Sequence, residues 1–563
     1  MKQAPYDVIV VGSGAGGGMS AYALVHEGLR VLMLEAGRDY DAAKEVPMFN
    51  LPTQAPLRGA PTPDKEFGFF DATVGGGWQV PDEPYTIAAG SEFKWWRARM
   101  LGGRTNHWGR VALRYGPYDF KPYSRDGLGV DWPISYEELA PWYDKVERLI
   151  GVTGAAHGLE NIPDSPPGVH LPPPPPTAAD YFVKRGLEAM GIPVAAMRAA
   201  ILTRPLNGRP ACVYATPCMR GCAIGANFQS TTVLIPPSRA TGKLEIRTHA
   251  MVYQVDVDRR NRAQGVSFVD RRTGRHHCVR ARAVVLAASA CESARILLNS
   301  RNASWPDGLA NESGLVGRNL LDNVMGEFGA QFPALEGMPA RNDDGISVGH
   351  LYVPWWGYGR QARQELDFPR GYHIEMGGGR LMPGAQDLPD FAEHCVAPFG
   401  AALREEIRRK YGSFYAFSAL GEMIPNTRSY CEIDPQAKDR WGIPVLKFHW
   451  QWGEYEQRQA QHMRKTFAEI VDRLGGKALP PAPDRLIAAG GEAIHEVGAL
   501  RMGTAARNSV VNSFGQSWHV KNLFVMDGGV FASAADKNPT LTLLALSWRN
   551  SAHLVAQARM GNL

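Results

Sequence analysis

Three cysteines in one short stretch are the first residues whose spacing suggests chemistry. Cys212, Cys218 and Cys222 form the pattern C-x5-C-x3-C in the glycine- and proline-containing run PACVYATPCMRGCAIGA. Thiolates are soft ligands that suit an iron–sulfur cluster or zinc. Since no fourth cysteine lies close by in the sequence, a cluster of three irons is favoured over a tetrahedral zinc site. Buried structural thiols or one disulfide are the alternative.

Glycines near the N-terminus predict a dinucleotide site. Gly12, Gly14 and Gly17 directly follow the apolar run Val8 to Val11. In this fingerprint the first glycine allows a tight turn, the second admits a pyrophosphate, and the third lets helix and strand pack closely. Glu35, at the end of the next apolar run, is placed to accept a hydrogen bond from a ribose hydroxyl. A glycine turn without a ligand is the alternative, and the N-terminal position favours FAD over NAD.

Strands and helices predicted around these residues would position them. A helix over Met19 to Glu27 and a buried strand over Val31 to Leu34 follow the glycines, and Ala283 to Ser300 predicts a further strand, turn and helix. A separate helix within Asp131 to Ile150 is predicted to begin with a capping box, formed by Ser135 and Glu138.

Composition indicates a large enzyme and excludes several classes. The chain has 563 residues, of which 44% are hydrophobic, so it can bury a sizeable core. Its net charge of +5 is small and comes without a basic tract, which gives no case for nucleic-acid binding. The apolar runs are too short to span a bilayer, and no secretory signal is visible. Seven cysteines, unevenly placed, argue against a disulfide scaffold.

A second glycine loop carries the resemblance to a known family. In RARMLGGRTNHWGR, Gly102 and Gly103 permit close approach of the backbone to a flat ligand, and Asn106 and His107 follow. Together with the N-terminal fingerprint, this run resembles the glucose-methanol-choline (GMC) family of flavoproteins, and the resemblance covers almost the whole chain. It implies that Gly103, Asn106 and His107 contact the flavin. In pyranose-oxidase-like members the corresponding histidine is bonded covalently to the flavin, so His107 is expected either to form that bond or to contact FAD noncovalently.

The resemblance also supplies a catalytic pair near the C-terminus. In GGEAIHEVGALRMGT and VMDGGVFASAADKNPTLTLLALSWRNSAHL, it implies that His495 and Asn538 face the flavin N5, and that Asp527 and Gly528 complete the FAD site. An alcohol gives up hydride only as its hydroxyl loses a proton, and imidazole is a suitable base. The family segment resembling Leu315 to Asn323 usually ends in histidine, so the contact made by Asn323 is left open.

The fold class implied is α/β, with a discontinuous Rossmann-like FAD-binding domain and an α+β substrate domain built on an antiparallel sheet. The expected division is 1–323 for the FAD domain with the cysteine loop at about 205–230, 324–480 for the substrate domain, and 481–563 for the return to the FAD domain. Alternating apolar and polar residues after 324 predict the antiparallel sheet. Trp355 and Trp356 could stack on a sugar or simply pack the sheet.

The closest resemblance is to the catalytic subunits of bacterial FAD-dependent sugar dehydrogenases. It implies oxidation of a secondary hydroxyl of a sugar or glycoside, with electrons passing from FAD through a [3Fe-4S] cluster held by the three cysteines to a cytochrome c. Glucoside 3-dehydrogenase activity is favoured, and gluconate, sorbitol or glucose dehydrogenase activity is the alternative within the family. Two further hypotheses come from other classes. One is an oxygen-using pyranose or glycoside oxidase, and the other is a redox-inert flavin-binding assembly protein.

Partners and location follow from the same resemblance. Such catalytic subunits lack their own signal and are exported folded with a small twin-arginine subunit, which implies a periplasmic location. Taken without the resemblance, the missing signal predicts a cytoplasmic protein.

Overall fold

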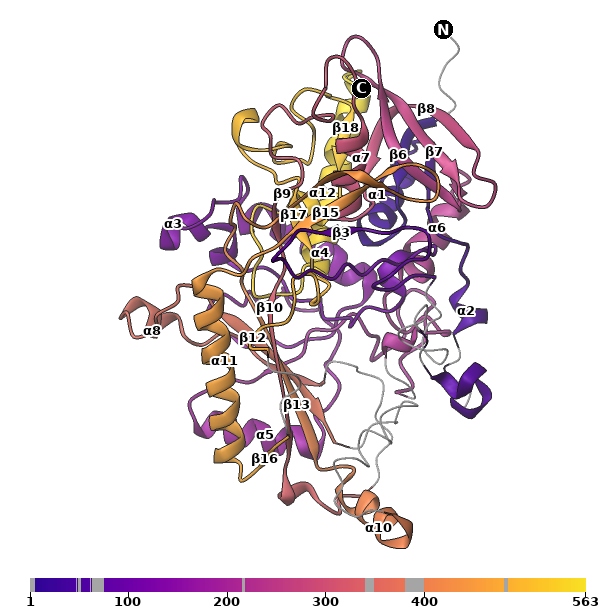
Figure 1. The fold of residues 1–563 in the computed structure, drawn as a ribbon. Helices are drawn as coiled ribbons and strands as arrows, with labels where there is room; N and C mark the ends of the chain where they lie inside the picture. The colour runs from indigo at the N-terminus through magenta and orange to yellow at the C-terminus, as the bar shows by residue number, and fades with distance from the viewer. Residues whose placement is uncertain are drawn as a thin grey trace.

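The fold is described from a computed structural model (Figure 1). It describes residues 6–46, 48, 52–60, 62, 75–214, 218–339, 349–379, 399–479 and 485–563. The α/β fold class predicted from the sequence is confirmed, because one mixed sheet with flanking helices and one antiparallel sheet make up the molecule.

The mixed sheet is built around the N-terminal strand. Its strand order is β5-β2-β1-β8-β7-β6, and β18 also pairs with β8. Strands β5, β2, β1, β8 and β18 run parallel, whereas β7 pairs antiparallel with the first half of β8 and β6 pairs antiparallel with β7. The strands are β1 Tyr6–Val11, β2 Val31–Leu34, β5 Leu244–Arg247, β6 Ala250–Val257, β7 Ala263–Asp270, β8 His276–Leu286 and β18 Leu523–Val525.

Helices from both ends of the chain pack around this sheet. Helix α1 follows β1 directly and contacts α12, which in turn contacts α4 (Figure 1). The capping box predicted for α4 is confirmed: Ser135 accepts from the Glu138 amide at 3.4 Å, and the Ser135 amide donates to the Glu138 carboxylate at 2.8 Å. The helices in this part are α1 Ala15–His26, α2 Ala42–Glu45, α3 Pro122–Asp126, α4 Tyr136–Ile150, α6 Ile235–Ala240, α7 Ala290–Asn299 and α12 Thr540–Arg559.

The antiparallel sheet forms the lower half of Figure 1, with α11 and α5 packed against it. Its order is β16-β10-β13-β12-β11-β4. The strands are β4 Ala195–Ala196, β10 Val324–Gln331, β11 Leu351–Val353, β12 Tyr372–Gly378, β13 Phe414–Gly421 and β16 Lys477–Ala478. The accompanying helices are α5 Ala178–Ala189, α8 Tyr358–Ala362, α10 Gly400–Lys410 and α11 Glu454–Arg473. Trp355 is buried among these elements and Trp356 packs beside it, so both pack the sheet.

Two small sheets connect the halves. Strands β14 (Tyr430–Lys438) and β15 (Pro444–His449) pair with β3 (Thr86–Ile87), and β9 (Arg318–Leu321) pairs with β17 (Val497–Ala499). The run WGIPVLKFHWQW contains β15, which pairs antiparallel with β14 and parallel with β3 in a small sheet against α7, separate from the larger antiparallel sheet. Within the described part of the chain, no helix is both long and apolar enough to cross a membrane.

Candidate active site

A cavity of about 410 Å³ lies where the predicted motifs meet. It is bounded by the first glycine turn, the second glycine loop, β12 and two C-terminal segments. The predicted site residues that line it are Gly12, Gly14, Glu35, Gly103, His107, His495, Asp527, Gly528 and Asn538. Gly17 and Asn106 lie behind the lining, as described below.

At the first glycine turn, the structure leaves room for a side chain at one of the three glycines and none at the other two. Gly12 has φ +98°, and a Cβ there would lie 2.4 Å from the carbonyl oxygen of Ala287. A Cβ at Gly17 would lie 2.0 Å from the carbonyl oxygen of Gly12, so glycine is needed for the helix to pack on the turn. A Cβ at Gly14 would meet no atom within 4 Å, and it would project from the turn that begins α1. Space at a helix N-terminus suits a phosphate group.

Ser13 joins the two glycine loops to the acidic residue. Its hydroxyl donates to Glu35 and accepts from the amide of Gly102, at 2.8 Å. Glu35 also accepts from the Gly37 amide at 2.7 Å, and burial raises the pKa of its carboxyl group. Gly103 lies directly beside the first turn, since a Cβ there would be 3.6 Å from the Cα of Gly14.

Asn106 and His107 differ in role. The Asn106 amide donates to the carbonyl of Leu101 at 2.8 Å and accepts from Thr231 at 2.9 Å, so it holds the loop from behind and does not line the cavity. His107 lines the cavity, and its Nε2 lies 3.1 Å from the indole nitrogen of Trp96. Because the indole nitrogen only donates, Nε2 accepts this bond. Burial lowers the pKa of His107 to about 3, so the ring is neutral.

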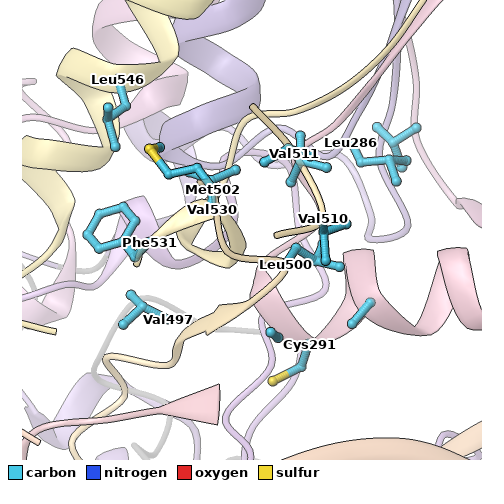
Figure 2. Packing of buried hydrophobic residues seen from close by; sticks show 14 of the residues in the cluster. Leu286, Cys291, Val497, Leu500, Met502, Val510, Val511, Val530, Phe531 and Leu546 are labelled. Atoms are coloured by element: carbon cyan, nitrogen blue, oxygen red, sulfur yellow. The ribbon is translucent and has the colours of Figure 1, made fainter. Parts of the chain in front are cut away.

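The loop is also connected to the segment of the predicted base. Arg104 pairs with Glu496 at 2.6 Å and donates to the carbonyl of Ile494 at 3.2 Å. Its guanidinium therefore contacts Ile494 and Glu496, the residues on either side of His495. Downstream, a hydrophobic cluster fixes the chain (Figure 2): Val497, Leu500 and Met502 pack with side chains from 510–511 and 530–531.

Hydrogen bonds fix which nitrogen of His495 carries the proton. The Asn323 amide nitrogen donates to the carbonyls of Gly421 (2.9 Å) and Ala535 (2.8 Å), which leaves its Oδ1 facing His495 Nδ1 at 2.9 Å. An amide oxygen only accepts, so Nδ1 carries the hydrogen and Nε2 is the unprotonated nitrogen. Burial lowers the pKa of His495 to about 4, with Arg104 acting in the same direction, and the ring is neutral at neutral pH.

Asn538 is held by a carboxylate that the sequence analysis did not identify. Its amide nitrogen donates to Oε1 of Glu375 at 2.9 Å, and Glu375 lines the cavity. The same Oε1 lies 3.2 Å from Nε2 of His373, whose Nδ1 faces the carbonyl of Asp536. Burial alone would raise the pKa of Glu375, but the hydrogen bonds from His373 and Asn538 bring it below its ordinary value. The only signal in the sequence is the spacing: two residues apart in a strand, His373 and Glu375 share one face.

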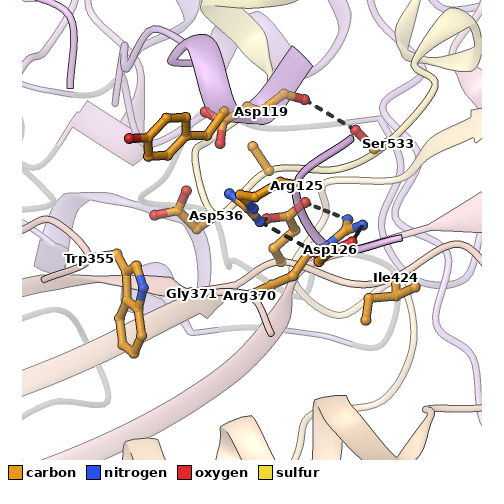
Figure 3. Close-up of polar contacts among 12 residues, drawn as sticks. Asp119, Arg125, Asp126, Trp355, Arg370, Gly371, Ile424, Ser533 and Asp536 are labelled. Atoms are coloured by element: carbon orange, nitrogen blue, oxygen red, sulfur yellow. Dashed lines mark hydrogen bonds and ion pairs between the residues drawn. The ribbon is translucent and has the colours of Figure 1, made fainter. Parts of the chain in front are cut away.

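Buried ion pairs fix the segment that precedes Asn538. Lys537 contacts Asp119 at 2.9 Å and Asp536 at 2.6 Å, with all three side chains almost fully buried. Nearby, Arg370 pairs with Asp126 at 2.9 Å, just before β12 (Figure 3). Removing one partner of such a pair leaves an uncompensated buried charge, which typically costs about 3–5 kcal/mol. The cluster therefore keeps β12 and the Asn538 segment in register.

Asp527 and Gly528 close the cavity at the end of β18. Asp527 accepts from the hydroxyl of Ser293 and from the amide of Gly529, at 2.5 and 2.8 Å. Burial raises the pKa of Asp527 to about 6. A Cβ at Gly528 would lie 3.1 Å from the side chain of Val497, so the backbone here is closely packed against β17.

The three clustered cysteines are described but do not form a metal site in the structure. Cys218 and Cys222 are buried, Cys212 is half-buried, and none of the three forms a disulfide in the described part of the chain. Their sulfur atoms accept from amides instead: Cys212 from Tyr214 and Cys222 from Ala226, both at 3.3 Å. Within the described ranges, no three His, Cys, Asp or Glu side chains are grouped so that they could hold a metal ion. The three thiols therefore do not fit a cluster as they stand.

Two family models match this chain, and both are described as GMC oxidoreductase. One matches residues 6–325 and the other residues 425–547. The chain belongs to the GMC oxidoreductase family, as its sequence motifs predicted. It is thus a flavoprotein enzyme of a family that binds FAD.

Relatives that align with nearly the whole chain support its membership of this family. The chain is 29% identical to 2-methyl-1,2-propanediol dehydrogenase of Mycolicibacterium austroafricanum, with 96% of this chain and 94% of the relative covered. It is also 29% identical to the fructose dehydrogenase large subunit of Gluconobacter japonicus, with 99% and 98% covered. The structure of pyridoxine 4-oxidase from Mesorbium loti superposes with a TM-score of 0.62 at 17% identity, covering 97% and 99% of the two chains, which shows a shared fold.

The residues present fit FAD. The open side of Gly14 at the start of α1 suits the pyrophosphate, and Glu35 lies at the end of β2, where a ribose hydroxyl would be accepted. His495 and Asn538 line the same cavity as the glycine turn, so one bound FAD could share that cavity with both side chains. These residue roles stay predictions for experiment.

Proposed function

We propose that the protein oxidises a hydroxyl group of a sugar or another polyol, with FAD as the hydride acceptor. The observation that carries the proposal is the tautomer of His495, whose Nε2 is an unprotonated base in the cavity. The relatives named for fructose and for a propanediol support this substrate class. Within the class, a secondary hydroxyl is favoured, with C3 of a pyranoside as the preferred position, from the resemblance of the GGRTNHWGR and ATPCMRGC runs.

The chain's own residues would supply the acid–base part of the reaction. FAD, when bound, would supply the hydride acceptor. Nε2 of His495 would take the hydroxyl proton as the carbon gives up its hydride, so that the alcohol becomes a carbonyl compound. Asn323 holds the His495 ring in the tautomer that can accept this proton. Because burial keeps the ring neutral, the base is ready at neutral pH.

Electron transfer out of the flavin is the finer part of the proposal. A dehydrogenase that passes electrons through a [3Fe-4S] cluster to a cytochrome c, with a small exported subunit and a periplasmic location, agrees with a relative named as a large subunit. The three cysteines are not grouped as a metal site among the described residues, so no step is assigned to a cluster. A second candidate is an oxidase that returns the electrons to oxygen and needs no relay, in agreement with a relative named as paromamine 6'-oxidase.

Anaerobic reduction of the purified holoprotein by a panel of sugars, glycosides, sugar acids and simple diols tests the proposal. We expect bleaching of the flavin absorbance by at least one polyol, and a carbonyl product visible by NMR. His495→Ala should keep bound flavin and lose fast reduction, and His495→Gln serves as a control that preserves size. A protein that no alcohol reduces, or a fast His495→Ala variant, would refute the function. Reoxidation rates with oxygen and with cytochrome c then separate oxidase from dehydrogenase.

A further inference from the structure

The amide of Asn538 has a defined orientation. Its nitrogen donates to Glu375, at 2.9 Å, and an ionised carboxylate can only accept. The amide oxygen, on the other side of the group, is buried and has no hydrogen-bond partner among the residues that the structure describes, and the residue as a whole is 7% exposed. A buried acceptor without a partner costs about 1–3 kcal/mol, so a ligand that donates to it would relieve this cost.

His373 keeps Glu375 in the ionised state that this orientation requires. Its Nδ1 faces a backbone carbonyl, which only accepts, so Nδ1 carries a hydrogen. Its Nε2 faces Oε1 of Glu375 at 3.2 Å, so a proton lies between these two atoms as well. With that proton on His373, the Nε2–H of His373 and the amide N–H of Asn538 both donate to Glu375. Neither the His373 ring nor the Asn538 amide can then turn over without losing a hydrogen bond.

His495 and Asn538 both line the cavity, and each carries one acceptor atom that the described residues leave without a donor. One is Nε2 of His495, which takes the hydroxyl proton, and the other is the buried Oδ1 of Asn538. A single hydroxyl has one hydrogen and cannot satisfy both. A substrate with two neighbouring donors can do so, because the second hydroxyl binds Asn538 while the first reacts.

We propose that the site selects alcohols that carry a second hydrogen-bond donor next to the oxidised hydroxyl, as in a vicinal diol or an adjacent amino alcohol, and that Asn538 reads this donor through its amide oxygen. Glu375 and His373 are positioning residues that hold Asn538 in this orientation. The inference rests on the proposed alcohol oxidation and narrows its substrate class. The neighbouring donor is not consumed, and the oxidised carbon alone loses hydride and proton.

The test compares derivatives of the polyol that reduces the wild-type flavin fastest. The hydroxyl next to the oxidised position is replaced by hydrogen, by a methoxy group or by an amine, and kcat/KM for anaerobic flavin reduction is measured. We expect the deoxy and methoxy compounds to lose about 10- to 100-fold and the amine to keep most of the rate. The methoxy group keeps the oxygen and removes only the donor, so it separates hydrogen bonding from size.

Variants show which residues are responsible. In Asn538→Ala the ratio between diol and deoxy compound should fall toward one, and in Glu375→Gln it should fall because the amide can turn over. The double variant should then show the same ratio as Asn538→Ala alone, as expected for residues that act through one another. Flavin content and melting temperature are measured for each, so that a folding defect is not mistaken for lost selectivity.

Neutron diffraction of the wild-type holoprotein gives a readout that does not involve turnover. Nuclear scattering distinguishes nitrogen from oxygen, and we expect the Asn538 nitrogen toward Glu375 and a hydrogen on both ring nitrogens of His373. An oxygen facing Glu375 overturns the inference. Wild-type reduction without discrimination among the derivatives also overturns it but leaves the proposed function intact, and would mean that Oδ1 meets FAD. A wild-type flavin that no alcohol reduces refutes both.

Discussion

The Oδ1 atom of Asn323 lies 2.9 Å from the Nδ1 atom of His495. The amide cannot turn over, because its nitrogen is committed to two backbone carbonyls. Asn323 thus determines which ring nitrogen of His495, the predicted base, is unprotonated. Asn323 itself does not line the cavity, so it acts through His495.

Replacing Asn323 should disturb catalysis without removing the cofactor. In Asn323→Ala the His495 ring loses the acceptor that fixes its tautomer, and we expect the rate of anaerobic flavin reduction to fall about 10- to 100-fold. This is less than the roughly 10²- to 10⁴-fold that general base catalysis typically contributes, because the base itself is retained. In Asn323→Asp an acceptor is restored and adds a negative charge, so activity should partly recover with the pKa of His495 raised. Stopped-flow reduction at several pH values measures both effects. Equal rates in Asn323→Ala and wild type would contradict the role assigned to Asn323.

The pH dependence of flavin reduction reports on His495 directly. Burial lowers its pKa to about 4, the Glu375 carboxylate opposes this shift, and Arg104 and His373 add to it. The base works only when unprotonated, so the rate should be constant at neutral pH and fall as the pH drops through about 4. Glu375→Gln removes the negative charge and should move this limb to still lower pH. A limb at pH 6.5 or above in the wild type, near the ordinary histidine value, would show that the ring is not desolvated as described.

The two glycine positions at the first turn should respond differently to alanine. A Cβ at Gly17 would meet the Gly12 carbonyl oxygen at 2.0 Å, so Gly17→Ala forces helix and turn apart and should destabilise the fold by about 1–3 kcal/mol or more. A Cβ at Gly14 meets nothing within the protein, so Gly14→Ala should fold normally and lose flavin. The ratio of flavin to protein absorbance and the thermal melting of the apoprotein measure the two effects. Normal flavin content in Gly14→Ala would place the pyrophosphate elsewhere.

The parts of the site that were predicted from sequence are those with local signals. The strand, glycine turn and helix around Gly12 are contiguous. Strands β1 and β2 form where they were predicted, and α1 begins at Ala15, four residues before its predicted start. Glu375 and His373 had no such signal, because β12 meets Asn538 only through the pairing of distant strands and the buried charges behind them. The division of the strands after 324 between two sheets could not be predicted for a related reason: alternation shows that a strand has two different faces and does not show which strand it pairs with.

Covalent attachment of FAD through His107 stays a prediction. The ring is buried and neutral and lines the cavity, but its Nε2 accepts a hydrogen bond from Trp96. A bond from Nε2 to the flavin would require this contact to be given up. Acid precipitation of the holoprotein decides the matter, since a covalent flavin stays with the pellet and a noncovalent one colours the supernatant. Should the pellet be yellow, His107→Ala must release the flavin into the supernatant.

The three clustered cysteines allow the electron route to be tested separately from alcohol oxidation. Cys212 and Cys222 do not line the flavin cavity, and neither does Cys218. If they bind the predicted [3Fe-4S] cluster, anaerobically purified protein should contain about three irons per chain. Cys218→Ser should then lose iron and reduction of cytochrome c while the rate of flavin reduction by the polyol stays near that of the wild type. Cys278→Ser, at an exposed position far from the cavity, is the matched control and should change neither. Iron near zero in the wild type, with rapid reoxidation by oxygen, would instead assign the thiols to packing, consistent with their amide contacts, and make the enzyme an oxidase.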